Sequence, residues 1–212
     1  MTCSQCCGIE QQFSDKVARR ELKKYRRRGP GKTTTMLLDL IMSANTRRDS
    51  LLDIGGGVGA IQHAMAASGA DSITSVDASP AYLDVSRSEA EERGYADRAT
   101  YIADNFVDAA ERVPEADVVT LDRVICCYHD VDALLGSAAS KARYAVGLVF
   151  PRERFHVRLG MGLLNRVLGL IGRDFRAFVH PHAKVERILA DRGFRFVAGC
   201  ESFVWRVALF AK

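Results

Sequence analysis

The sequence predicts an α/β fold, in which a mostly parallel sheet carries helices on both faces. Three observations lead to this prediction. From residue 50 onward, short apolar runs alternate with helical segments, which is typical of a parallel sheet. Glycines at 55–57 and 59 follow the first apolar run, at a strand end where open α/β sheets bind ligands. Two apolar runs separated only by a turn end the chain, and they predict a hairpin with one antiparallel strand.

Two helices are expected before the sheet begins, at 9–28 and 34–44, because apolar residues recur there at helical spacing. A Gly-Pro-Gly sequence at 29–31 separates them. The expected strands lie at 51–54, 72–76, 99–103, 116–121, 143–150, 194–199 and 202–210. The helices of the sheet region are expected at 58–68, 80–93, 106–110, 131–140 and 181–192.

The chain has 212 residues and a mass of 23.3 kDa, a size typical of one domain with a small appendage. We expect a helical arm at 1–48 and a ligand-binding domain at 49–212. Within this domain, an insert at 151–180 follows the fifth strand and is expected to cover the site of a second ligand. The insert contains an apolar helical stripe formed by Leu159, Leu163, Leu164, Val167, Leu168 and Ile171.

Charge is distributed unevenly along the chain. Residues 1–48 hold 11 Lys or Arg and 4 Asp or Glu, although the whole chain holds 30 and 26. The segment 151–176 holds six Arg against two acidic residues. A basic arm and a basic insert indicate attraction to an anion, such as nucleic acid, a membrane surface or an acidic small molecule.

No apolar run reaches the roughly 18 residues that a membrane-spanning helix needs, and the polar N-terminus does not resemble a secretory signal. We therefore expect a cytoplasmic protein whose six cysteines are free thiols. Cys3, Cys6 and Cys7 form a C-x-x-C-C cluster. No second ligand pair follows at the spacing of a zinc site, so no metal is expected.

The glycine loop fits two classes of ligand. Gly55-x-Gly57-x-x-Ala60, with Asp77 further on, matches a dinucleotide fingerprint. The alternative is S-adenosylmethionine, because the carboxylate of Asp53 just before the loop is a poor neighbour for a pyrophosphate. Asp104-Asn105 after the third strand could also hold an adenine amino group.

These features together resemble the class I S-adenosylmethionine-dependent methyltransferases. The resemblance covers about residues 50–212 and rests on four features. They are the D-x-G-x-G-x-G loop at 53–59, the acidic strand end at Asp77, the Asp104-Asn105 pair and the closing hairpin. It implies a Rossmann-like, seven-stranded, mostly parallel sheet with an antiparallel last strand, and an enzyme that uses S-adenosylmethionine.

The resemblance also implies a set of cofactor-binding residues at the carboxyl ends of the first four strands. The glycines would lie under the methionine part and the ribose, the second acidic strand end would bind the ribose, and the Asp-Asn pair would bind adenine. The set comprises Asp53, Gly55, Gly57, Gly59, Asp77, Ala78, Asp104, Asn105, Asp122 and Arg123.

The sequence favours a small methyl acceptor over nucleic acid. The residues after the fourth strand, Leu121-Asp122-Arg123-Val124, are not the [N/D]-P-P-[Y/F] pattern of enzymes that methylate bases. More loosely, the arm, a Pro-Arg pair at 151–152 and the apolar insert resemble the magnesium-protoporphyrin O-methyltransferases. That likeness implies an apolar or aromatic acid as acceptor, such as a porphyrin propionate.

A hydroxyl acceptor would need a general base, whereas a carboxylate would need none. His129 after the fourth strand is the first candidate base, and His156 on the insert is the second. Two other functions stay open at this point. They are an NAD(P)-dependent oxidoreductase and a protein that binds S-adenosylmethionine without catalysis, with its basic arm on nucleic acid or a membrane.

Overall fold

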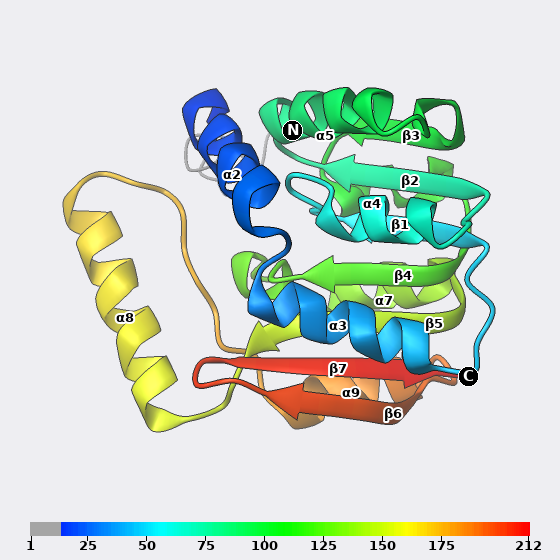
Figure 1. Cartoon of the computed structure of the whole chain (residues 1–212). Helices are drawn as coiled ribbons and strands as arrows, with labels where there is room; N and C mark the ends of the chain where they lie inside the picture. The colour runs from blue at the N-terminus through cyan, green and yellow to red at the C-terminus, as the bar shows by residue number, and fades with distance from the viewer. Residues whose placement is uncertain (1–13) are drawn as a thin grey trace.

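A seven-stranded sheet in the order β3-β2-β1-β4-β5-β7-β6 forms the centre of the molecule (Figure 1). The structure is a computed structural model and describes residues 14–212. The strands are β1 Ser50–Ile54, β2 Ser72–Asp77, β3 Ala99–Ala103, β4 Ala116–Asp122, β5 Ala142–Pro151, β6 Arg195–Glu201 and β7 Trp205–Ala211. The first five pair in parallel, and β7 runs antiparallel to both β5 and β6. The predicted fold class and closing hairpin are confirmed.

Helices cover both faces of this sheet. They are α2 Asp15–Arg28, α3 Lys32–Ser43, α4 Ala60–Ala67, α5 Pro80–Glu92, α6 Phe106–Ala109, α7 Val131–Lys141, α8 Phe155–Leu170 and α9 His182–Ala190. Short 3-10 turns lie at Ala96–Arg98, Ala110–Arg112 and Ile125–Cys127. Each predicted helix lies within a few residues of an observed one; of the first, residues 9–13 lie outside the described part of the chain.

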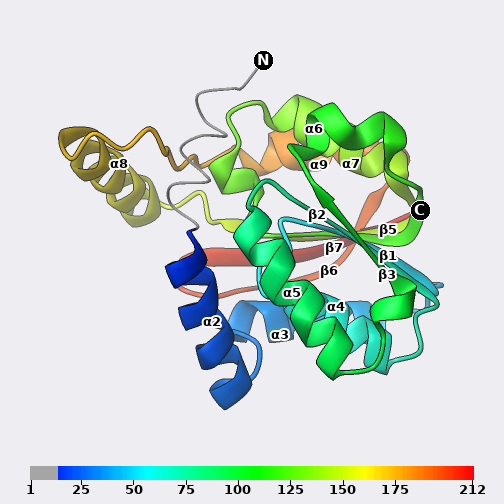
Figure 2. The same ribbon diagram turned by 90° about the horizontal axis from the view of Figure 1, so that it is seen from above.

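Figure 2 shows α3, α4 and α5 on one face of the sheet and α6, α7 and α9 on the other. The first layer buries Leu37 and Ile41 of α3 against β5 and β7. Gly147 of β5 allows this close packing, because a Cβ there would lie 2.9 Å from Leu37 Cδ1. The second layer packs around Leu121, Leu135 and Phe150.

Two helices lie beyond the carboxyl ends of the parallel strands (Figures 1 and 2). One is α2, whose Ala18 is buried against Tyr82 and Val85 of α5. The other is α8, which stands apart from the sheet at the periphery of the molecule. The carboxyl edge of the sheet is therefore enclosed from two sides.

In residues 14–212, no helix is long and apolar enough to cross a membrane.

Candidate functional site

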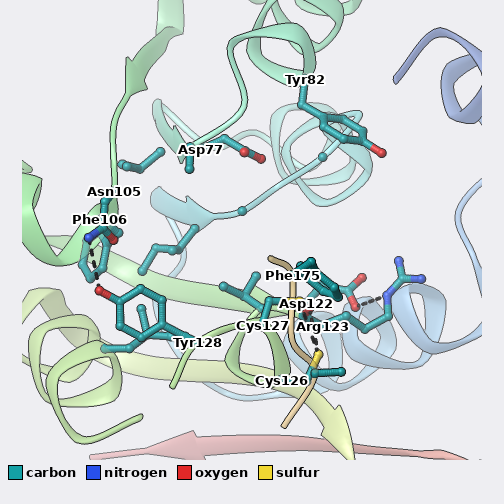
Figure 3. Close-up of a pocket in the computed structure, with 18 of the residues that line it drawn as sticks. Asp77, Tyr82, Asn105, Phe106, Asp122, Arg123, Cys126, Cys127, Tyr128 and Phe175 are labelled. Atoms are coloured by element: carbon teal, nitrogen blue, oxygen red, sulfur yellow. Dashed lines mark hydrogen bonds and ion pairs between the residues drawn. The ribbon is translucent and has the colours of Figure 1, made fainter. Parts of the chain in front are cut away.

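A cavity of about 420 Å³ opens at the carboxyl edge of the sheet (Figure 3). Its walls come from the carboxyl ends of β1 to β4, from residues of α2, α5, α6, α7 and β7, and from α8 with the loop that follows it. The lining includes eight predicted site residues, namely Gly55, Gly57, Asp77, Ala78, Asp104, Asn105, Asp122 and Arg123. Asp53, Gly59, His129 and His156 do not line it.

The glycine loop presents bare main chain to this cavity. Gly55 and Gly57 have φ values of 64° and 56°, in the left-handed region that side chains rarely adopt. A Cβ at Gly55 would also lie 2.6 Å from Val124 Cγ2. Any larger residue at Gly55 would both strain the backbone and displace Val124, so this position requires glycine. Its bare main chain lines the cavity.

Asp53 and Gly59 support the loop from behind. Asp53 is completely buried, and its carboxylate accepts hydrogen bonds from Thr120 Oγ1 at 2.7 Å and Gln62 Nε2 at 3.0 Å. Burial raises the pKa of Asp53 to about 6, although these two hydrogen bonds oppose the shift. A Cβ at Gly59 would lie 2.5 Å from Ser86 Oγ. In this structure both residues shape the loop, and Asp53 also lines a neighbouring cavity of about 370 Å³.

Asp77 ends β2 and faces the cavity beside Ala78. Its Oδ1 atom accepts a hydrogen bond from the backbone N–H of Ser79 at 2.8 Å. Burial raises the pKa of Asp77 to about 6, and backbone hydrogen bonds from Ser79 and Gly57 oppose the shift. The hydrogen bonds to Asp77 among the described residues come from backbone N–H groups and not from a basic side chain, so this carboxylate can accept hydrogen bonds from a ligand's hydroxyl groups.

The Asp104-Asn105 pair lies at the end of β3. The Asp104 carboxylate forms an ion pair with Arg112 and accepts the N–H of Asn105 at 2.7 Å. The Asn105 amide donates to Asp108 Oδ2 at 2.8 Å and to Tyr128 OH at 3.1 Å. Both side chains therefore already have protein partners, and a ligand here would share these groups with the protein.

Asp122 and Arg123 form the turn after β4. Among residues 14–212, Arg123 is the non-glycine residue with a positive φ, at 62°, and its Nε atom donates to Asp122 Oδ1 at 3.0 Å. Thr34 Oγ1 of α3 donates to Asp122 Oδ2 at 2.5 Å. A strained residue at a ligand site is a common sign of functional constraint. Arg123 lines the cavity, and its half-exposed guanidinium group pairs with Asp122.

Glu21 of α2 and Tyr82 of α5 line the cavity but are not among the residues predicted from the sequence. Tyr82 OH donates to Glu21 Oε2 at 2.7 Å, and burial raises the pKa of Tyr82. The helical spacing in α2 was visible in the sequence. The position of α2 over the cavity depends on tertiary packing, which the spacing does not encode.

The far end of the cavity is apolar and contains sulfur. Its lining comprises Cys126, Cys127, Met161, Leu164, Phe175, Ala177 and Trp205. The Sγ atoms of Cys126 and Cys127 lie 3.7 Å apart, and Cys126 donates to the Arg123 carbonyl at 3.2 Å. The contact between the two thiols lowers the pKa of Cys127 and raises that of Cys126. This end suits an apolar ligand.

The two predicted base histidines lie outside the cavity. His129 is exposed and stacks on Tyr128, and His156 is exposed with Nε2 3.2 Å from the Phe203 carbonyl. His180 instead fixes the turn beside the cavity, because its Nε2–H is shared between the carbonyls of Ile125 and Tyr128, each at 2.9 Å. Burial lowers the pKa of His180, so it stays neutral near pH 7.

Within residues 14–212, His, Cys, Asp and Glu form no group of three or more that could hold a metal ion. The predicted C-x-x-C-C cluster of Cys3, Cys6 and Cys7 lies outside the described residues.

A family model described as a methyltransferase domain matches residues 18–198. A search of curated proteins found no match. Among solved structures, magnesium protoporphyrin IX methyltransferase from Synechocystis PCC 6803 with bound SAH is 20% identical, with a TM-score of 0.74, and the match covers 98% of this chain and 99% of that one. An O-methyltransferase family protein from Burkholderia thailandensis is 15% identical, with a TM-score of 0.70 and coverage of 96% and 63%.

An O-methyltransferase family 2 protein from Planctomyces limnophilus, in complex with apigenin, is 18% identical with a TM-score of 0.66, and the match covers 94% of this chain and 62% of that one. At these identities, the structural likenesses establish the shared fold.

Proposed function

Because the chain belongs to the methyltransferase-domain family and is an S-adenosylmethionine-dependent methyltransferase, we propose that it methylates an oxygen of a small apolar or aromatic acid, such as a porphyrin propionate. One observation carries this proposal. A single cavity joins a polar cradle at Gly55, Gly57 and Asp77 to an apolar end at Met161 and Phe175. A donor and an acceptor bound in it would lie in one continuous space.

The cradle fits the donor. Gly55 and Gly57 present bare main chain to the cavity, and Asp77 can accept hydrogen bonds from ribose hydroxyls. Asn105 also lines the cavity, and we propose that it contacts the adenine. When bound, S-adenosylmethionine supplies an electrophilic methyl group on a sulfonium. Much of the catalysis of such an in-line displacement is the positioning of the two reactants.

The acceptor end supports an anionic, apolar molecule. Arg123 can pair with an acidic group of the acceptor, while the apolar lining at Leu164 and Trp205 packs against its hydrocarbon part. A carboxylate acceptor needs no proton removal, which agrees with a cavity that neither His129 nor His156 lines. Four expectations from the sequence stay predictions. They are the general-base roles of these histidines, the cytoplasmic location, the division of the chain at residue 48 and a membrane contact of the basic arm.

Two measurements test the proposal. Calorimetry should detect binding of S-adenosylhomocysteine. Labelled S-adenosylmethionine should transfer its methyl group to an apolar aromatic acid but not to the same acid with every carboxyl group already esterified. The product should be a methyl ester that alkali cleaves. A panel of apolar aromatic acids and phenols completes the test. The proposed acceptor is wrong if the protein binds S-adenosylhomocysteine but methylates none of the acids, or if it methylates the phenols instead.

A matched pair of variants on α8 locates the acceptor. Leu164 lines the cavity, whereas the neighbouring Leu163 does not. Leu164→Glu should raise the KM for the acid about tenfold or more, because a charge replaces an apolar contact. Leu163→Glu should leave the KM for a dissolved acid unchanged, and equal effects of both would show that the acceptor binds elsewhere.

A further inference from the structure

The outward side of α8 exposes large apolar side chains. Phe155 is 79% exposed, Leu159 and Leu163 are each 63% exposed, and Leu170 is 86% exposed. Phe203, in the turn between β6 and β7, is 75% exposed and stacks on His156 at the start of the helix. We call Phe155, Leu159, Leu163, Leu170 and Phe203 the α8 patch. Apolar surface gathered in this way on a protein usually marks an interaction site.

The patch is distinct from the surface that α8 uses within the protein. Val157 and Leu168 are buried, Met161 packs against the Phe175 cluster, and Leu164 lines the cavity. These positions repeat at helical spacing on one side, and the patch residues repeat on the opposite side. Since α8 stands at the periphery of the molecule (Figures 1 and 2), its second apolar side faces outward.

The surroundings of the patch are basic. The segment 151–176 holds six arginines and two acidic residues. Arg158 pairs with Glu153, but Arg154 and Arg166 have no ion pair with any carboxylate within residues 14–212. Arg166 lies on the same side of the helix as Phe155 and Leu159, as the helical period requires. Uncompensated cations thus border the apolar side chains.

We propose that the α8 patch inserts into the interface of an anionic lipid bilayer. An apolar helix face bordered by arginines is typical of helices that lie in the plane of the headgroups, where arginine stems follow the acyl boundary and guanidinium groups reach the phosphates. A second copy of the chain fits less well, because two such faces would bring their arginines together. A nucleic acid would not cover the leucines.

Binding of α8 to a bilayer would also give the acceptor a route to the cavity, an inference that rests on the proposed function. The same helix carries Leu164 on the cavity wall and Leu163 on the patch, so an apolar acid dissolved in the bilayer would reach the cavity along α8 without crossing water. Lipid binding itself does not depend on the identity of the acceptor.

Co-sedimentation with vesicles tests the proposal on the full chain. The protein should bind vesicles of equal parts phosphatidylcholine and phosphatidylglycerol about tenfold or more tightly than vesicles of phosphatidylcholine alone, and salt should weaken this preference. Leu159→Glu and Leu163→Glu should each weaken binding to the anionic vesicles about tenfold. Arg166→Glu should remove much of the preference for the anionic lipid.

Val197→Glu is the matched control, since Val197 is 55% exposed on β6, away from α8. It should leave vesicle binding unchanged. The proposal is overturned if the protein ignores both vesicle types, if Val197→Glu weakens binding as much as Leu159→Glu, or if the patch variants only abolish a dimer seen by sedimentation equilibrium. Calorimetry with S-adenosylhomocysteine on the same variants distinguishes this failure from failure of the proposed function.

Discussion

At the residue scale, the cavity depends on carboxylates whose pKa values are shifted by burial. Asp77 lines the cavity, and Asp53 lies behind the glycine loop. Burial raises the pKa of each to about 6. The ionisation of Asp77 is therefore expected to control ligand binding, and that of Asp53 the stability of the protein around the loop.

Binding of S-adenosylhomocysteine should weaken as the pH falls below about 6. Ribose hydroxyls donate to the ionised form of Asp77, whose pKa is about 6 in the free protein. If only this form binds, the dissociation constant at pH 5 should be about tenfold larger than at pH 7. Calorimetry across this range measures the change. Asp77→Asn should bind more weakly at pH 7 and lose the dependence; a dependence retained in this variant would assign the titration to another group.

Asp53 should make the protein less stable as the pH rises from 4 to 6. Its pKa is 3.8 when unfolded and about 6 when folded, so the unfolded chain loses this proton first and the free energy of unfolding falls. The contribution is fully present well below the unfolded pKa of 3.8 and is lost as the pH passes the folded pKa of about 6. The total decrease is about 3 kcal/mol, of which about 2 kcal/mol falls between about pH 4 and pH 6. Urea unfolding should show that stability decreases less over this range in Asp53→Asn than in the unsubstituted protein, because only Asp77, whose folded pKa is also about 6, still contributes. Parallel curves for the two proteins would contradict the shift.

At the scale of elements, α2 is held to α5 by charge as well as by packing. Arg26 Nε donates to Glu89 Oε1 at 2.7 Å, and the Glu89 carboxylate is only 2% exposed. Burial alone would raise the pKa of Glu89, but hydrogen bonds from Arg26 and Arg93 outweigh it and lower the pKa. The position of Glu21 over the cavity depends on this contact.

Arg26→Ala should therefore destabilise the protein by about 1–3 kcal/mol, since it removes one of two partners of a buried carboxylate. It should also speed dissociation of S-adenosylhomocysteine, because Glu21 and Tyr82 wall the cavity from α2 and α5. Denaturant unfolding and stopped-flow dissociation measure the two effects. Arg27→Ala is the control, as Arg27 has no ion pair in the described chain; equal effects of both variants would exclude a role for the pair.

The elements predictable from the sequence were those that a local pattern determines. The apolar runs specified the strands, and the glycines at 55–59 specified the loop, because bare main chain is needed there whatever the partners are. In α8, apolar residues occur on both sides of the helix, so periodicity could not separate Leu164 at the cavity from Leu159 and Leu163 at the surface. The placement of α2 and the outward position of His129 depend on tertiary packing.

At the scale of the whole molecule, positive charge gathers where the sheet ends. The basic α2 and the arginine-rich segment 151–176 both lie beyond the carboxyl edge (Figure 1). The cavity opens between them, and Arg123 lies inside it. The lining itself also holds four carboxylates, of Glu21, Asp77, Asp104 and Asp122. The long-range attraction for an acidic ligand is therefore expected from the basic segments around the cavity, which raise the local concentration of anions near its entrance.

Salt should therefore weaken binding of the acceptor far more than binding of the donor product. Raising the ionic strength from 0.1 to 1 M shortens the screening length from about 10 to about 3 Å. The dissociation constant of an apolar acid should increase about threefold or more over this range. Its neutral amide should be unaffected, because it keeps the apolar contacts and lacks the charge. S-adenosylhomocysteine has opposite charges that nearly cancel, so its affinity should change little in the same titrations. If the amide and the acid respond equally, the basic edge attracts no acceptor, and the apolar lining alone selects the molecule that is methylated.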